Sequence, residues 1–334
     1  MFGALRIQCA RGEKNQRKLH DAILAQIAQT MKLRSNKALL SLLGIVLLAI
    51  IVTPTRIFLD PGNLTDILRQ VSVTGIIALA MTFVILTAGI DLSVGSTLAL
   101  ATSVVAMELK PNSNMAIAIL LALAASAAVG AVNGACVALL KIQPFVVTLA
   151  TMIGIRGLAK WLTGNANIDI GFGQDVAARF AELLRTKTVV IGTWIVLSIT
   201  FWMLLQRTVF GRHVRAVGDN EHAALYAGLQ IRSVKIWVYT LAGLLSGVAG
   251  VLYAAENHQG NPNAGVAYEL DAIAAVVIGG TKLSGGSGSI GGTIVGTLTI
   301  GILTNMLRLN NVDSNVEMML KAVIIVLAVT LQKR

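Results

Sequence analysis

A charged segment at residues 210–229, FGRHVRAVGDNEHAALYAGL, lies between two long apolar stretches. Asp219 and Asn220 are residue types that accept hydrogen bonds from the free N–H groups at a helix start, and Gly228 is the type that ends a helix in the left-handed conformation. This spacing predicts a helix of about two turns over residues 221–227. Because so short a helix is unstable alone in water, we expect it to pack against another surface. An ordinary solvated loop is the alternative.

Two glycine-rich segments share the pattern G-x-x-L-S-x-G-S, namely GIDLSVGS at residues 89–96 and GTKLSGGS at residues 280–287. Each follows an apolar stretch and precedes another. Paired glycine-interrupted segments of this kind indicate a duplicated transporter fold with broken helices, and glycines that only allow close helix packing are the alternative. The candidate residues of these segments are Gly89, Asp91, Ser93, Gly95, Gly280, Ser284 and Gly286.

Asp91 is the ionisable residue of the first segment, and an ionisable group at membrane depth is by default a functional candidate. However, Asp91 or Ser93 can cap the helix that follows, and the second segment has Lys282 at the equivalent position. We therefore predict a capping role rather than ion transport. Arg156 and Lys321 are interpreted in the same way, as snorkelling or paired structural charges rather than relay groups.

The chain lacks the sequence motifs of the common catalytic sites. It contains no G-x-x-x-x-G-K-[ST] phosphate loop, no G-x-S-x-G and no H-E-x-x-H. The four histidines and two cysteines have no metal-ligand spacing. The chain is therefore predicted not to be an enzyme, not to hydrolyse ATP itself, and to hold no metal or cofactor.

The elements that position these residues are apolar helices. The composition is 55% hydrophobic and 13% charged, with 32 glycines and a mean hydropathy of +0.75. It indicates an all-α, polytopic membrane protein, in which a span needs about 20 apolar residues. We expect about ten spans in two related halves, although the eighth segment is too short to cross alone. The segments are 38–53, 71–88, 94–109, 116–140, 145–163, 189–206, 236–255, 271–281, 290–306 and 317–331.

The net charge of +11 raises the question of nucleic-acid binding, but the basic residues sort by membrane side. With ten crossings, most of them fall in the tail at residues 1–37, the loop at 207–235 and the C-terminus. This bias places these three parts in the cytoplasm by the positive-inside rule, and it argues against nucleic acid as a partner. The tail carries no signal-peptide pattern, and its basic residues would contact anionic lipid headgroups.

Four longer motifs make the chain resemble the permease subunits of ABC sugar importers, the ribose-type branch that includes arabinose, xylose and galactose permeases. They are AMTFVILTAGIDLSVGS at 80–96, the 210–229 segment, YELDAIAAVVIGGTKLSGGSGSIGGTIVG at 268–296 and LKAVIIVLAV at 320–329. The resemblance covers residues 37–331. It implies a bacterial inner-membrane protein that forms a homodimer or pairs with a related permease. It also implies a cytoplasmic ABC ATPase and a periplasmic sugar-binding protein as partners.

By this resemblance, the 210–229 segment corresponds to the coupling loop that contacts the ATPase. Ala223, Ala224 and Gly228 match the A-A-x-x-x-G core of that motif, whereas Glu221 lies one position early and the downstream I-x-L-P is missing. Small alanines would allow close approach, and Glu221 and Arg212 could form an ion pair across the interface. Asp219 and Asn220 belong to the same candidate contact set.

The sequence is therefore interpreted as a cytoplasmic tail at 1–37 and an importer transmembrane domain at 38–334, with a coupling loop at 207–235. The predicted function is ATP-driven import of a monosaccharide. An ion-coupled secondary transporter with a buried carboxylate at Asp91 or Asp271 is one alternative, and a membrane scaffold that transports nothing is another. Hydroxyl and amide groups suit a weakly binding sugar path, for which the candidates are Thr87, Asn133, Thr151, Thr304 and Asn305.

Overall fold

The computed structural model describes residues 38–110, 113–171, 175–313 and 315–323. Helices dominate these residues, and the strands β1 (Ile168–Asp169) and β2 (Gln259–Gly260) form one short antiparallel pair. A helix at Ala38–Val52 precedes the labelled elements. In chain order these are α2 (Thr55–Phe58), α3 (Pro61–Leu86), α4 (Val94–Glu108), α5 (Met115–Leu139), α6 (Pro144–Leu162), α7 (Val176–Leu184), α8 (Lys187–Arg207), α9 (Val209–Asp219), α10 (Glu221–Tyr226), α11 (Ile231–Asn257), α12 (Tyr268–Ile278) and α13 (Ile290–Leu309).

Six of the described helices are long and apolar enough to cross a membrane: α3, α5, α6, α8, α11 and α13. The predicted class, an all-α membrane protein, is thus confirmed, whereas the count of about ten spans is not. Ala38–Val52 and α4 are apolar but shorter than a span. The segment expected at 271–281 is the 11-residue α12, and that at 317–331 is described only as far as residue 323.

The helices α3, α13 and α11 are the most buried of the long helices. Their apolar stretches are 78%, 67% and 61% buried, compared with 22% for α5, 17% for α6 and 28% for α8. The outer helices therefore turn most of their apolar surface outward, as lipid-facing helices do. In α4, by contrast, twelve of the 15 residues are buried. This short helix packs among α5, α6 and α11 as part of the core.

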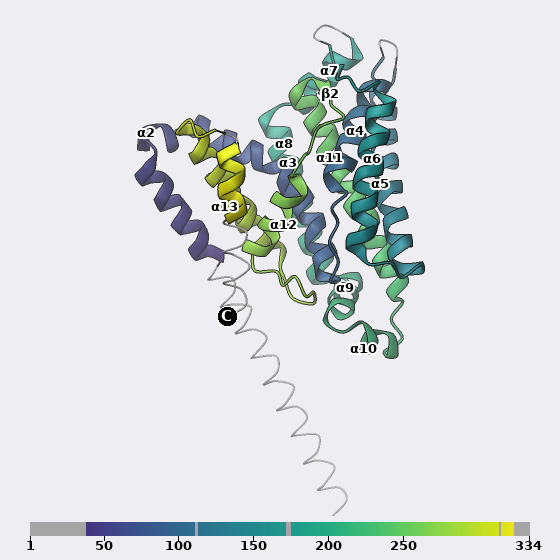
Figure 1. The fold of residues 1–334 in the computed structure, drawn as a ribbon. Coiled ribbons are helices and arrows are strands. Elements are labelled where there is room, and N and C mark those ends of the chain that lie inside the picture. The colour runs from purple at the N-terminus through teal and green to yellow at the C-terminus, as the bar shows by residue number, and fades with distance from the viewer. Residues whose placement is uncertain (1–37, 111–112, 172–174, 314, 324–334) are drawn as a thin grey trace, which may run out of the picture.

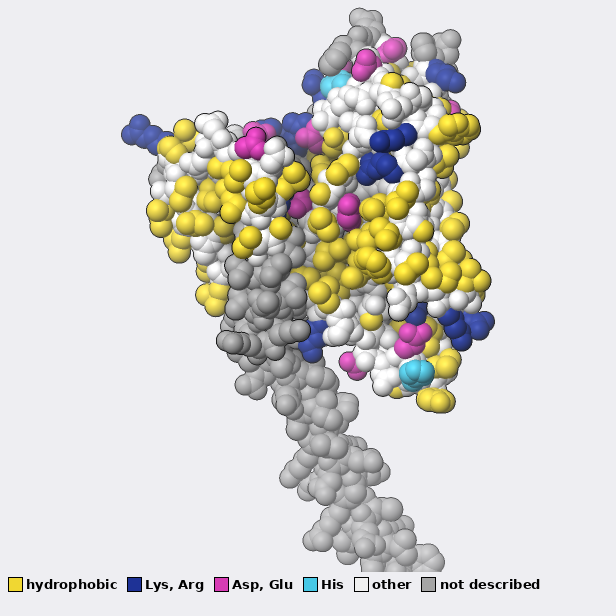
Figure 2. Space-filling model, in the orientation of Figure 1, with side chains coloured by type: hydrophobic (Ala, Val, Ile, Leu, Met, Phe, Trp, Pro, Cys, Tyr) yellow, Lys and Arg dark blue, Asp and Glu magenta, His cyan; other side chains and the backbone are white. Residues whose placement is uncertain are grey.

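The two ends of the bundle differ in their elements (Figure 1). At one end lie α9 and α10, and at the other lie α2, α7 and the β1–β2 pair. Figure 2 shows apolar side chains over the middle of the visible face and charged side chains gathered toward the ends. This banding is the pattern expected of a protein that spans a bilayer.

Candidate functional site

The 207–235 segment contains two helices instead of the single predicted one. Asn220 caps α10, because its side chain accepts a 2.9 Å hydrogen bond from the N–H of Ala223. Gly228 follows the end of α10 with φ of +79°, as predicted. Asp219, predicted as a second cap, instead ends α9 and makes no capping bond. The sequence reasoning missed α9, although Thr208 caps its start by accepting from Gly211.

Part of the exposed surface of α10 is apolar. Ala223 is exposed, whereas Ala224 is only 4% exposed and packs into the core. Leu225 and Tyr226 are 58% and 89% exposed, and the sequence reasoning did not single them out. Large apolar side chains at a water-facing end of the bundle mark a surface that fits a protein partner.

One ion pair joins α10 to the bundle. The carboxylate of Glu221 lies 2.8 Å from the Nζ atom of Lys235 at the start of α11. Glu221 therefore has a partner within the chain, and Arg212, its expected partner across an interface, is exposed on α9.

The C-terminal end of α9 packs against the end of α3 and the second glycine-rich segment. The N–H of Gly286 donates to the carbonyl of Leu86 at 3.0 Å, which joins the second segment to the last residue of α3, three positions before the first segment. A Cβ atom on Gly218 would collide with the carbonyl of Leu86 and would lie 2.7 Å from the backbone nitrogen of Gly286. Three backbone segments thus meet at Gly218 without side chains between them. We call this contact of Gly218, Leu86 and Gly286 the glycine junction.

The glycines of the two segments serve close packing and turns. Added Cβ atoms on Gly89 and Gly95 would collide with the Tyr239 hydroxyl and the Gly265 carbonyl. Gly280 and Gly286 have φ of +89° and +72°, which only glycine adopts readily. Ser284 lies exposed in the same loop. The first segment leads from the end of α3 into the bundle, where Gly95 meets Gly265, whereas the second segment contacts Asp219 at the end of α9.

Asp91 belongs to a buried chain of polar side chains. Its carboxylate accepts from the N–H of Ser93 at 2.8 Å and from the Ser93 hydroxyl at 2.6 Å. The amide of Asn133 donates to that hydroxyl at 2.9 Å, and Thr151 donates to Asn133 at 2.7 Å. Asp91 therefore shapes the turn that leads into α4 rather than capping the free N–H groups of the helix, and it joins α4 to α5 and α6.

Arg156 and Lys321 are held by partners, as predicted for structural charges. Arg156 donates to the carbonyls of Pro262, at 3.0 Å, and Ala264. Lys321 lies 3.2 Å from Asp271 and 3.0 Å from Glu317.

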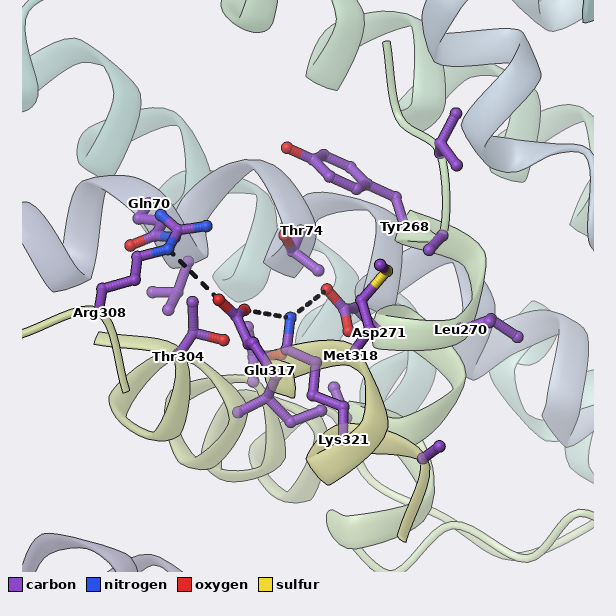
Figure 3. Close-up of a pocket in the computed structure, with 18 residues that line it drawn as sticks. Gln70, Thr74, Tyr268, Leu270, Asp271, Thr304, Arg308, Glu317, Met318 and Lys321 are labelled. Atoms are coloured by element: carbon purple, nitrogen blue, oxygen red, sulfur yellow. Dashed lines mark hydrogen bonds and ion pairs between the residues drawn. The ribbon is translucent and has the colours of Figure 1, made fainter. Parts of the chain in front are cut away.

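A pocket lies between α3, α12, α13 and the helical segment at 315–323 (Figure 3). Its volume is about 330 Å³. The lining combines the linked charges of Arg308, Glu317, Lys321 and Asp271 with neutral polar groups and the ring of Tyr268; the neutral groups include Gln70, Thr74, Thr297 and Thr304. Gln70 lies in the first half of α3 and Arg308 in the last turn of α13. The pocket is therefore in the half of the bundle away from α9 and α10.

The five residues expected along a substrate path are not brought together. Thr304 lines the pocket, whereas Asn133 and Thr151 belong to the buried chain of Asp91. Asn305 exchanges hydrogen bonds with Asn63, and Thr87 caps the end of α3. No group of three or more histidine, cysteine, aspartate or glutamate side chains suited to a metal occurs among the described residues.

Comparisons with known proteins cover nearly the whole chain. Residues 63–329 match the family described as branched-chain amino acid transport system / permease component. The chain is 42% identical to the ribose import permease protein of Escherichia coli over 306 residues, 90% of this chain and 94% of the relative. It is 43% identical to that of Bacillus subtilis over 296 residues, 87% and 91% of the two chains. It is 35% identical to the fructose import permease protein of Rhizobium meliloti over 328 residues, which are 94% of this chain and 90% of the relative. No solved structure matches the chain significantly.

Proposed function

Because the chain belongs to the family of branched-chain amino acid transport system / permease components, we propose that it is the permease subunit of an ATP-driven ABC importer for ribose or a similar monosaccharide. The observation that carries the sugar assignment is the similarity to sugar import permeases along about nine tenths of the chain. The protein is a translocation subunit rather than an enzyme, and ATP hydrolysis belongs to a separate subunit.

In this function α10 is the contact with the cytoplasmic ATPase. The exposed Ala223, Leu225 and Tyr226 support this role, since they offer apolar surface at one end of the bundle. The Glu221–Lys235 ion pair and the buried Ala224 attach α10 firmly to the bundle. Motion of the ATPase would then move α9 and α10 as one body.

The glycine junction carries that motion into the membrane. Gly218 contacts the end of α3 through Leu86 and the loop before α13 through Gly286. A displacement of α9 therefore acts on two elements that border the pocket, α3 and α13. This is how we propose that the ATPase switches the bundle between outward-facing and inward-facing states.

A binding protein would deliver sugar at the opposite end of the bundle, near α2, α7 and the β1–β2 pair. The outward apolar faces of α5, α6 and α8 are suited to lipid and to a second permease, either an identical copy or a related chain. Both termini lie in the cytoplasm of a bacterium, and the basic tail at 1–37 faces anionic lipid. The tail and the C-terminal residues lie outside the described residues.

Reconstitution into proteoliposomes tests the proposal. The permease alone should neither hydrolyse ATP nor take up sugar, because the chain has no nucleotide-binding loop. Adding the ATPase and the ribose-loaded binding protein encoded with it should confer ATP-dependent uptake. Uptake driven by a proton or sodium gradient alone would instead support an ion-coupled transporter, and the absence of uptake under every condition would support a scaffold.

A further inference from the structure

We infer that the pocket between α3, α12, α13 and the 315–323 segment is a transient binding site for a neutral polyhydroxy compound, the sugar in transit. This inference rests on the proposed function and adds to it the location and the chemistry of a site within the membrane domain. The volume of the pocket, about 330 Å³, falls at the lower end of the range of small-molecule sites.

The first observation is a set of polar side chains that have no partner in the described protein. Gln70, Thr74 and Thr304 line the pocket, and their side chains make no hydrogen bond to another described residue. Threonines elsewhere in the helices behave differently; for example, Thr200 and Thr240 donate to carbonyls four residues earlier at 2.8 Å. The free hydroxyl and amide groups of the pocket are thus available to a ligand that both donates and accepts.

These polar side chains lie on helix faces that are turned toward the pocket. Gln70 and Thr74 are four residues apart on α3, and Thr304 and Arg308 are four residues apart on α13, so each pair shares one helix face. Figure 3 shows the two faces turned toward each other across the pocket, with Tyr268 and Asp271 of α12 on a further side. A ligand held here would contact three helices at once.

The second observation is the balance of charge. The pocket holds two cations and two anions, and three ion pairs of 3.0–3.6 Å link Arg308, Glu317, Lys321 and Asp271 into one chain. An ion entering this site would meet no net opposite charge, whereas sugar hydroxyl groups can donate to the carboxylates and accept from the cations. The ring of Tyr268 offers the flat apolar surface on which the C–H face of a sugar can lie.

The location suits a transit site. The pocket lies in the half of the bundle where the binding protein would deliver sugar, and two of its walls, α3 and α13, lead to the glycine junction. Movement of α9 would therefore change the distance between walls that hold the sugar. A site whose charged groups are already paired with one another also binds weakly, as transport requires.

The test removes single hydroxyl groups that have no structural partner. Thr74→Val and Thr304→Val keep side-chain shape and break no hydrogen bond within the described chain. The control is Thr200→Val, at an exposed site on α8, where the hydroxyl donates only to the carbonyl of Val196 in its own helix. Each variant is reconstituted with the ATPase and binding protein, and uptake of radiolabelled ribose is measured beside ATP hydrolysis stimulated by the binding protein.

We expect each pocket variant to slow ribose uptake roughly fivefold, the effect of one lost hydrogen bond, while stimulated ATP hydrolysis and the control variant stay at the parent level. Uptake at the parent rate in both pocket variants, with an active parent, overturns the pocket assignment and leaves the importer function intact. Unchanged uptake together with loss of a co-purifying phospholipid in mass spectra assigns the pocket to lipid instead. A parent that shows no ATP-dependent uptake removes both proposals.

Discussion

At the scale of single residues, two adjacent alanines of α10 have opposite environments. Ala223 is exposed and Ala224 is buried in the core. We predict that Ala223→Arg inserts and folds normally but fails to retain the ATPase, because a large cation then stands on the contact surface. Co-purification of the ATPase with the tagged permease measures this.

The control for this variant is Asn263→Arg, which adds the same charge to an exposed loop elsewhere and should retain the ATPase fully. Ala224→Arg should instead lower the yield of folded protein, because overpacking a core costs about 1–3 kcal/mol. Retention of the ATPase by Ala223→Arg at parent stoichiometry would remove the case for α10 as the ATPase contact.

Gly228 allows a test of backbone conformation without a change in packing. Its φ is +79°, and an added Cβ atom would have no neighbour within 4 Å. We predict that Gly228→Val destabilises the end of α10 by about 1 kcal/mol or more, through the left-handed conformation alone. Gly228→Asn should cost less, since asparagine tolerates this conformation. ATPase retention should follow the same order, and equal retention by the two variants would contradict the prediction.

Lys321 and Lys187 form a second matched pair. Lys321 is 17% exposed and pairs with the buried Glu317 and the partly buried Asp271, whereas Lys187 is 41% exposed and pairs with the exposed Asp66. Lys321→Ala should cost more, on the order of 3 kcal/mol, because Asp271 then has no ion-pair partner and Glu317 keeps only Arg308. Lys187→Ala should cost less than about 1 kcal/mol. Thermal unfolding of the detergent-purified protein compares them, and equal shifts would show that the Lys321 ion pairs do not stabilise the 315–323 segment.

At the scale of elements, the glycine junction joins α9 to α3 and to the loop before α13. We predict that Gly218→Ala separates ATP hydrolysis from transport, because its added methyl group pushes α9 away from Leu86 and Gly286. The ATPase should remain bound, since α10 is unchanged, while ribose uptake per ATP hydrolysed should fall. Paired measurements of uptake and hydrolysis in proteoliposomes give this ratio.

Gly291→Ala is the control for this substitution, because a Cβ atom at that position of α13 meets no atom within 4 Å. It should leave the ratio unchanged and even favour the helix slightly. A Gly218→Ala protein with the parent ratio of uptake to hydrolysis would show that motion does not pass through the glycine junction.

At the scale of the whole molecule, the distribution of basic residues predicts the orientation in the membrane. Reporter fusions after Arg34, Arg215 and Arg334 should give a cytoplasmic signal, and a fusion after His258 should give a periplasmic one. Arg215 lies on α9, and His258 follows the end of α11, a 27-residue helix long enough to cross. A periplasmic signal at Arg215 would reverse the orientation and remove α10 from the reach of a cytoplasmic ATPase.

The sequence alone determined the features that depend on neighbouring residues. Apolar composition indicates the membrane class, Asn220 and Gly228 mark the ends of α10, and the longer motifs identify the family, because caps, turns and hydrophobic stretches are local properties. The count of about ten spans stays unconfirmed for a related reason. Hydropathy reports apolar length but not whether a helix such as α4 faces lipid or lies inside the protein.

Only the tertiary structure decided which residues meet. The glycine junction joins residues 86, 218 and 286, and the pocket joins side chains from residue 70 to residue 322. The face that Ala224 buries, the partner of Glu221 and the separation of Thr304 from Asn133 also follow from packing between distant helices. One helix period places a side chain on a face, but the crossing of other helices determines whether that face meets lipid, core or pocket.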